Sequence, residues 1–146
     1  MPVKRLSHST GIELPAYATM DSAGMDLRAA IAACISLPPG ERVLIPTGIA
    51  LALPSGYEGQ VRPRSSLALK HGITILNSPG TVDADYRGEL KVILINHGNQ
   101  SFTVRSGERV AQLVIAPTAK VSLQEASDLP DSDRGKGGFG STGIGS

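Results

Sequence analysis

The sequence predicts an all-β protein of one domain, because glycine and proline punctuate it at short intervals and aliphatic residues dominate the segments between them. The chain has 146 residues, of which 17 are glycine and 10 proline, and 40% of the residues are hydrophobic. A chain of this length buries about two-thirds of its unfolded surface, so a single core is sufficient. Many short strands with one helical turn are typical of a sandwich, a jelly roll or a barrel.

The individual elements follow from runs of Val, Ile and Leu between turn residues. Strands are expected at residues 42–46, 48–53, 59–63, 72–76, 89–96, 101–105, 109–116 and 120–126. The stretches "PPG", "PSG", "SPG" and "HGN" supply turns between them. The one expected helix is short, residues 65–72, with a serine to cap its start and Gly72 to end it.

Two of these strands, 89–96 and 109–116, carry aliphatic residues on both alternating faces. A strand with one wet face alternates apolar and polar residues instead. The second face is therefore covered, either by another sheet of the same chain or by another subunit. Because aromatic residues make up only 3% of the chain, we favour an oligomer.

Composition excludes several classes of partner. Fourteen Lys and Arg against thirteen Asp and Glu give a formal charge of +1, with no run of one sign, so neither a nucleic-acid nor a membrane partner is expected. Cys34 is the only cysteine and the three histidines are scattered, which argues against disulfides and zinc motifs. No aliphatic run approaches the ~20 residues of a membrane span. We expect a cytoplasmic protein.

The last twenty residues differ from the rest. We expect a β domain over residues 1–126 and a flexible lid over 127–146, acidic at first and then glycine-rich in "RGKGGFGSTG". This stretch lacks the order of a Walker A motif. Its glycines allow close approach to an anion, Arg134 offers donors to phosphate, and the ring of Phe139 suits stacking on a base. The alternative is a flexible tail with a chance aromatic residue.

The stretch "NSPGTVDADYRGE", residues 77–89, holds paired carboxylates. On an extended chain Asp83 and Asp85 point the same way and Tyr86 points opposite. Such a pair holds a metal or activates a water molecule that a cation polarises or that is held for in-line attack. The alternative is an acidic turn before the strand that begins at Glu89.

Three further signals concern anions and buried polar groups. Arg64 and Ser65 stand at the start of the expected helix, where free N–H groups favour an anion; a capped surface helix is the alternative. Gln112 lies in an otherwise aliphatic strand and needs partners for its amide, most simply a structural hydrogen bond. Asp26 follows Gly24 at a strand entry, which by itself indicates only a turn.

Taken in order, "AGMDLRA", "PRSSLALKHG", "NSPGTVDADYRGE", "GERVAQLV" and "RGKGGFGSTG" resemble the five motifs of the trimeric dUTPase family. The resemblance runs from about residue 20 to residue 143. It implies a distorted β jelly roll that forms a homotrimer and hydrolyses dUTP to dUMP and pyrophosphate with Mg²⁺. Such an enzyme keeps uracil out of DNA and supplies dUMP for dTMP synthesis. Each site lies at a subunit boundary, and the C-terminal tail of one subunit closes over a site that the other two build.

The resemblance also implies roles for residues of the third motif. Asp83 resembles the general base that activates the attacking water, with Asp85 in a supporting role. Tyr86 resembles the residue whose ring packs beneath the deoxyribose and excludes a 2′-hydroxyl. The hairpin that binds uracil and crowds out a 5-methyl group would use Asn77 and the main chain around Thr81, Val82 and Lys91.

The other motifs carry implied contacts to the phosphates, the metal and the base. Arg64, Ser65 and Ser66 fall on the phosphate-binding motif, and Gln112 falls close to the phosphates. Asp26 matches the aspartate that holds the Mg²⁺ hydration shell or its arginine partner. In the tail, Phe139 matches the ring that stacks over uracil, and further substrate contacts fall on Arg134, Gly140, Ser141 and Thr142.

Two positions depart from the family pattern. A glycine commonly stands where this chain has Ser66, and a small loss of binding is expected if the backbone there needs a positive φ. Val82 replaces the usual isoleucine, which is conservative. Two other functions compete: a dCTP deaminase-like enzyme of the same fold, which has a glutamate in place of Asp83 and lacks the Phe-bearing tail, and a non-catalytic deoxynucleotide-sensing module.

Overall fold

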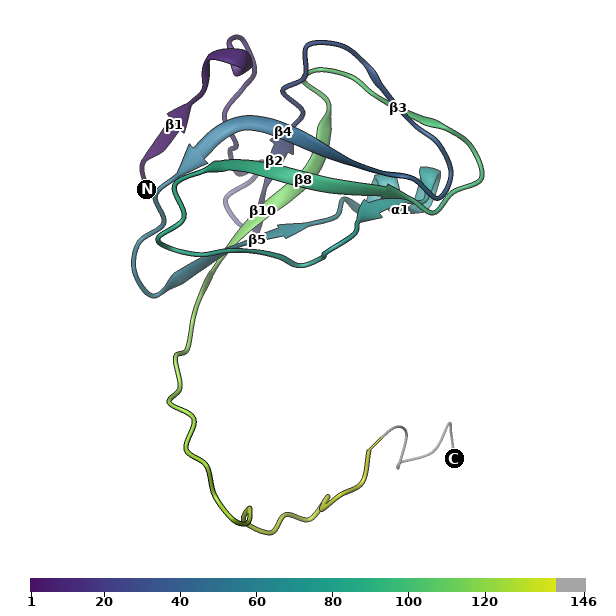
Figure 1. Ribbon diagram of the computed structural model, residues 1–146. Coiled ribbons are helices and arrows are strands. Elements are labelled where there is room, and N and C mark those ends of the chain that lie inside the picture. Colours follow the sequence, from purple (N-terminus) through teal and green to yellow (C-terminus); the bar gives the residue numbers. More distant parts are fainter. Residues whose placement is uncertain (139–146) are drawn as a thin grey trace.

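The protein folds into two antiparallel four-stranded sheets that enclose one core, with a third, two-stranded ribbon at one end (Figure 1). The computed structural model describes residues 1–138. The first sheet has the order β1-β4-β8-β6, the second β2-β10-β5-β7, and the ribbon is β3-β9. The strand bounds are β1 Val3–Arg5, β2 Gly24–Arg28, β3 Ile35–Leu37, β4 Arg42–Leu51, β5 Tyr57–Arg62, β6 Ile73–Ile75, β7 Gly80–Val82, β8 Glu89–Asn96, β9 Phe102–Val104 and β10 Arg109–Pro117.

One hydrophobic cluster lies between the two sheets. Ile45 of β4 and Leu94 of β8 face Leu27 of β2 and Leu113 of β10 across it, and all four side chains are almost completely buried. Burying a side chain of this size stabilises the fold by about 1.5–3 kcal/mol. This arrangement confirms the predicted all-β class and jelly-roll architecture.

Most strands lie where the pattern of aliphatic residues places them, and β8 has the predicted bounds. The segments 42–46 and 48–53, expected as two strands, form the single strand β4. Its pairing with β8 shifts register between Pro46 and Ala50, where Gly48 has φ of 69°. The irregularity at Gly48 is therefore a bulge within one strand rather than a turn between two.

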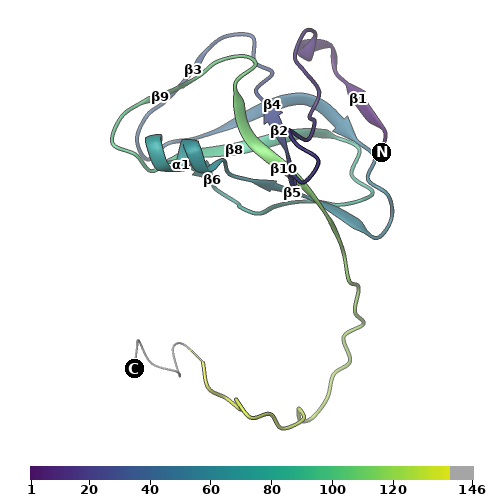
Figure 2. The same ribbon diagram turned by 180° about the vertical axis from the view of Figure 1, so that it is seen from behind.

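The predicted strand at residues 120–126 is wrong, because the chain beyond Pro117 forms no strand among the described residues. The side chains of Val121 and Leu123 are 82% and 93% exposed. A strand needs a partner for its backbone groups, and no neighbouring strand of this chain lies beside the segment. Figures 1 and 2 show it leaving the body at the end of β10 and running away from both sheets.

The helix α1, Ser65–His71, confirms the predicted helix but not its predicted serine cap. Arg64 is the N-cap residue, with no side-chain capping bond, and Ser65 is already helical. At the other end Gly72 adopts the left-handed conformation, with φ of 67°, and ends the helix as predicted. A short 3₁₀ helix, Ser7–Ser9, lies in the N-terminal segment. No helix among residues 1–138 is long and apolar enough to cross a membrane.

The outer face of the first sheet carries aliphatic side chains that stay partly exposed among residues 1–138. Leu44 of β4 pairs with Ile93 of β8, and Leu44 is 52% exposed. Leu76 donates its N–H to the Ile93 carbonyl and is 48% exposed. The core thus accounts for the aliphatic residues on one face of β8, and those on the opposite face stay partly exposed.

Candidate active site

The third motif includes β7, which pairs with β5 through Gly59 and Val82, and the turn that follows this strand. The Tyr86 N–H donates to the Asp83 carbonyl over 3.1 Å, so residues 83–86 form a turn. The sequence predicted that Asp83 and Asp85 point the same way on an extended chain, but the chain between them forms a turn and is not extended.

A cavity of about 310 Å³ lies between this turn and β8. It is lined by residues of β7, the turn and the start of β8: Thr81, Val82, Asp83, Tyr86, Glu89, Leu90 and Lys91. Most of the residues that the resemblance assigns to uracil and deoxyribose therefore meet in one place. Asn77 is exposed at the foot of the same hairpin, with its amide nitrogen close to Gly80.

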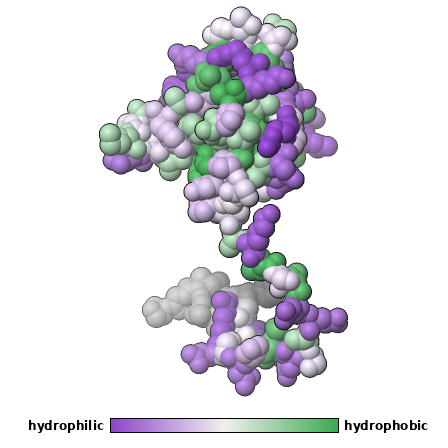
Figure 3. Space-filling view, turned by 90° about the vertical axis from the view of Figure 1, so that its left-hand side faces the viewer, coloured by the Kyte–Doolittle hydropathy of each residue, from purple (hydrophilic) through white to green (hydrophobic). Residues whose placement is uncertain are grey.

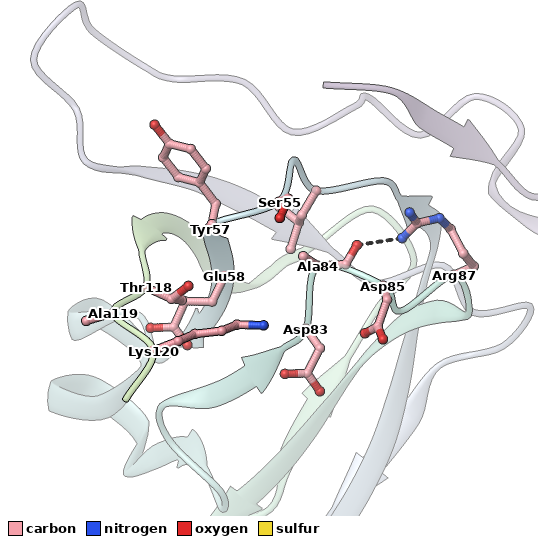
Figure 4. A pocket seen from close by; sticks show the side chains of 12 residues that line it. Ser55, Tyr57, Glu58, Asp83, Ala84, Asp85, Arg87, Thr118, Ala119 and Lys120 are labelled. Atoms are coloured by element: carbon pink, nitrogen blue, oxygen red, sulfur yellow. Dashed lines mark hydrogen bonds between the residues drawn. The ribbon is translucent and has the colours of Figure 1, made fainter. Parts of the chain in front are cut away.

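Asp83 also borders a larger cavity, of about 650 Å³, on the side where the chain leaves β10. Its lining includes Asp85 from the turn, Glu58 from β5 and Lys120 from the segment after β10. Figure 4 shows the Lys120 side chain extending towards the turn that carries Asp83. The Asp83 carboxylate is exposed, and therefore open to water and to a nucleotide.

The phosphate-binding candidates form a second group, on β2, β10 and the start of α1. Asp26 binds two arginines at once: its Oδ1 lies 3.0 Å from Arg64 Nε, and its Oδ2 accepts from Arg109 over 3.3 Å. Arg64 Nη1 also donates to the Arg109 carbonyl over 3.2 Å. Of the two implied roles for Asp26, the structure shows the pairing with arginine.

Gln112 lies in the same sheet, directly opposite Asp26 on one side and Arg62 on the other. Its amide nitrogen donates to the Pro63 carbonyl over 2.9 Å, which confirms the expected structural hydrogen bond. A Cβ at Gly24 would come within 2.7 Å of the Gln112 amide oxygen. Gly24 and Pro63 therefore hold this amide beside Asp26.

Ser65 and Ser66 are exposed on the first turn of α1. Beside them a basic cavity of about 910 Å³ extends along Arg64 and Arg109 to Arg28 and Arg105. Each of these arginines also contacts a carboxylate: Arg64 and Arg109 contact Asp26, Arg28 contacts Glu13, and Arg105 contacts Glu108. An arginine has five N–H donors, so the remaining donors suit a phosphate group.

The two groups of candidate residues do not share a cavity in one chain, because Tyr86 and Arg64 border different ones. In the tail, the Arg134 guanidinium donates to the Gly137 carbonyl over 2.8 Å and lies in the exposed segment. The remaining tail candidates, Phe139, Gly140, Ser141 and Thr142, lie outside the described residues.

Three residues of the site escaped prediction from the sequence. Arg109 is the second cation on Asp26, and its place in "GERVAQLV" was the available signal. Gly88 and Glu89 support Tyr86, although "RGE" reads only as the end of a turn. The contact of Arg109 joins residues far apart in the sequence, whereas those of Gly88 and Glu89 with Tyr86 lie within three residues and depend on the conformation of the turn.

The described residues contain no cluster of three or more His, Cys, Asp or Glu side chains suited to a metal ion. Both oxygens of Asp26 already accept from arginine. Asp26 is therefore suited to an indirect contact with Mg²⁺, because this ion often keeps its water molecules and binds mainly to substrate phosphates in nucleotide-binding proteins. Asp26 would then reach it through water.

Known proteins resemble this chain in sequence and in fold. The dUTPase family model matches residues 10–143. Proteins named deoxyuridine 5′-triphosphate nucleotidohydrolase are 59% identical in Maricaulis maris, over 97% of this chain and 95% of that protein, and 56% identical in Rhizobium rhizogenes, over 96% and 91%. The solved dUTPase of Staphylococcus bacteriophage 80alpha with dUPNHPP is 28% identical, with a TM-score of 0.87 over 98% of each chain. The chain belongs to the dUTPase family.

Proposed function

We propose that this chain hydrolyses dUTP to dUMP and pyrophosphate at a site shared between subunits. The observation that carries the proposal is the division of the motif residues into two groups, one beside Tyr86 and the other around Arg64 and Asp26, on different cavities of one chain. A complete site then forms when the first group of one subunit meets the second group of its neighbour.

In the first group, the main chain of Thr81, Val82 and Lys91, with Asn77, binds the uracil ring, and the Tyr86 ring lies under the deoxyribose. Edge strands and turns offer free N–H and C=O groups, which suit the hydrogen-bonding edge of a base. A cavity of about 310 Å³ is at the lower end of the range for small-molecule sites.

Asp83 acts as the general base. Its carboxylate orients a water molecule and accepts its proton as the water oxygen attacks the α-phosphorus. The bond from the α-phosphorus to the oxygen that bridges it to the β-phosphorus breaks, and pyrophosphate leaves with that oxygen. Asp85, two residues on, supports the turn and takes no proton.

The second group binds the phosphates. Asp26 orients the Arg64 guanidinium through an ion pair, and Arg64 donates to the phosphates. Charge-assisted hydrogen bonds of this kind are about twice as strong as neutral ones. Ser65 and Ser66 add hydroxyls, and Gln112 fixes the sheet beside them. Asp26 would hold Mg²⁺ through water, and the ion would neutralise part of the phosphate charge when bound.

Residues 127–146 act as a lid over this site. Arg134, Ser141 and Thr142 contact the γ-phosphate, and Phe139 stacks on uracil with Gly140 beside it. Closing the lid excludes water from the reacting phosphate and positions it. Ordering costs about 1 kcal/mol or more per residue in backbone entropy, so several charge-assisted contacts are needed to offset it.

A homotrimer supplies the partner surfaces. The outer face around Leu44, Leu76 and Ile93 is apolar and partly exposed in the part of the chain that the structure describes. The segment after β10 exposes Val121 and Leu123 on alternate positions, as a strand would against another subunit. Figure 3 shows hydrophobic atoms in this segment, apart from the body.

The assembly is tested by measuring mass in solution. The expected mass is three times 15.1 kDa. Leu44→Asp, which places a charge on the apolar face, should shift the mass towards that of a monomer, whereas Met20→Asp at a 99% exposed position should not. A trimer unaffected by Leu44→Asp would exclude this face as the interface.

The activity is tested by measuring pyrophosphate release from dUTP, dCTP, dTTP and UTP with Mg²⁺. Release from dUTP alone is expected. Deamination of dCTP would support the deaminase-like alternative. Binding of nucleotide without release of pyrophosphate would support the sensing module.

We also propose that the protein is located in the cytoplasm, and cell fractionation tests this location.

A further inference from the structure

We propose that Gly88 and Glu89 are positioning residues that fix the Tyr86 ring, and that the N-terminal segment, through His8, holds Glu89 in place. The inference rests on the proposed function, in which Tyr86 faces the sugar of the nucleotide. It adds a device that decides how strictly the pocket rejects a ribonucleotide.

The Tyr86 ring is held at both ends. Its backbone N–H donates to the Asp83 carbonyl over 3.1 Å, and its phenol donates to the Glu89 carbonyl over 3.0 Å. The ring lies close against the backbone of Gly88, where a Cβ would come within 2.3 Å of the phenol oxygen and 2.5 Å of the ring carbon that bears it. Only glycine at position 88 leaves room for this placement.

The Glu89 side chain is anchored from the other side. Its carboxylate is 14% exposed, and Oε1 accepts from the Gly48 N–H and contacts His8 Nε2, both over 2.8 Å. Lys91 Nζ lies 3.8 Å from Oε2. Close contacts from two other segments, at Gly48 and His8, thus fix the residue whose carbonyl receives the Tyr86 phenol, and Lys91 of the same strand adds a longer ion pair.

The N-terminal segment builds the anchor at Gly48. The Gly48 carbonyl accepts from the Ser9 hydroxyl over 2.7 Å and from the Leu6 N–H over 2.8 Å. Ser9 is fully buried, and a Cβ at Gly48 would come within 2.1 Å of the Ser9 side chain. The bulge in β4, the N-terminal segment and the nucleoside cavity are therefore linked by consecutive contacts.

This chain of contacts bears on selectivity because a 2′-hydroxyl is small. If the Tyr86 ring shifts slightly, the pocket admits a 2′-hydroxyl, whereas a fixed ring excludes that group. Rejection of an extra group by shape alone is usually modest, so it depends on how rigidly the pocket wall is held. The phenol bond and the contact with Gly88 provide that rigidity.

The test measures discrimination between dUTP and UTP, as the ratio of kcat/KM values and as the ratio of Kd values for their non-hydrolysable α,β-imido analogues. Tyr86→Phe keeps the ring and removes the bond, and the ratios should fall by about fivefold, equivalent to about 1 kcal/mol. Gly88→Ala displaces the ring, and the ratios should fall by about tenfold or more. Tyr17→Phe, at an exposed tyrosine, is the matched control and should leave them unchanged.

The anchor has its own variants. His8→Ala and Glu89→Ala should each reduce the ratios, and Glu89→Gln should restore them to within about twofold of the wild type, because the amide oxygen still accepts from Gly48. A merely structural role for Glu89 would alter the melting temperature without altering discrimination. If Gly88→Ala or Glu89→Ala fails to fold, Tyr86→Phe and His8→Ala decide.

Ratios within about twofold of the wild type in Tyr86→Phe and His8→Ala would overturn the proposal. A fall in kcat/KM for dUTP with an unchanged ratio would also overturn it. Failure of the proposed function looks different, since the wild type itself would then release no pyrophosphate from dUTP. The Kd ratios still test the positioning device in that case.

Discussion

Replacing Asp83 with asparagine isolates the chemical step. The change is isosteric and lies at an exposed side chain, and the turn that Asp83 forms with Tyr86 uses the backbone carbonyl, which asparagine retains. A surface substitution of this kind changes stability by about 0.5 kcal/mol or less. The fold and the nucleoside cavity should therefore survive, and only the proton acceptor is lost.

The expected loss follows from the role of a general base. Such a group contributes about 10²- to 10⁴-fold, so kcat should fall by this factor, equivalent to about 3–5 kcal/mol in the barrier. The Kd of α,β-imido-dUTP should change by less than about threefold. Pyrophosphate release at saturating dUTP gives kcat, and titration calorimetry gives the Kd.

Asp85→Asn is the matched control, because it removes a carboxylate from the same exposed turn and borders the same larger cavity as Asp83. We expect its kcat to stay within about fivefold of the wild type. The role assigned to Asp83 is refuted if Asp83→Asn keeps kcat within about tenfold of the wild type. It is also refuted if the Kd rises by the same factor as kcat falls.

The other predictions concern the lid and the core. Deleting residues 134–146 should leave the oligomer folded by circular dichroism with little dUTP turnover, and a truncated chain with full kcat would contradict the lid. Because the chain has no tryptophan, Phe139→Trp gives a single reporter whose fluorescence should change when α,β-imido-dUTP and Mg²⁺ bind; an unchanged spectrum would argue against stacking. Asn96 is fully buried, and its side chain donates to the Leu37 and Gln100 carbonyls and accepts from the Gly98 N–H, each over 2.8 Å. Asn96→Ala leaves three backbone groups without this partner and should lower the free energy of unfolding by about 3–4 kcal/mol in urea, whereas a loss below about 1 kcal/mol would show that water replaces the amide.

Local chemistry made much of the fold predictable. The strand β8 and the αL glycine at the end of α1 depend on neighbours in the sequence, and both were predicted. The strands β1, β3 and β7 were not predicted as strands, and of β2 only an entry near Asp26 was predicted, since these strands are short and are defined by their pairing partners rather than by their own pattern. The strand predicted at residues 120–126 failed for the converse reason, because it has the pattern but pairs with no strand among residues 1–138.

The candidate site divides in the same way. Its residue types, such as a carboxylate followed by a tyrosine in a turn and an arginine before two serines, are chemical information that the sequence alone carries. The tertiary structure decided that Asp26 lies between Arg64 and Arg109, and that Glu89 connects Tyr86 to the N-terminal segment. These contacts join residues more than thirty positions apart, except for Tyr86 with Glu89. Side chains so distant along the chain meet only after the sheets pair and pack, and no local pattern in the sequence records that they do.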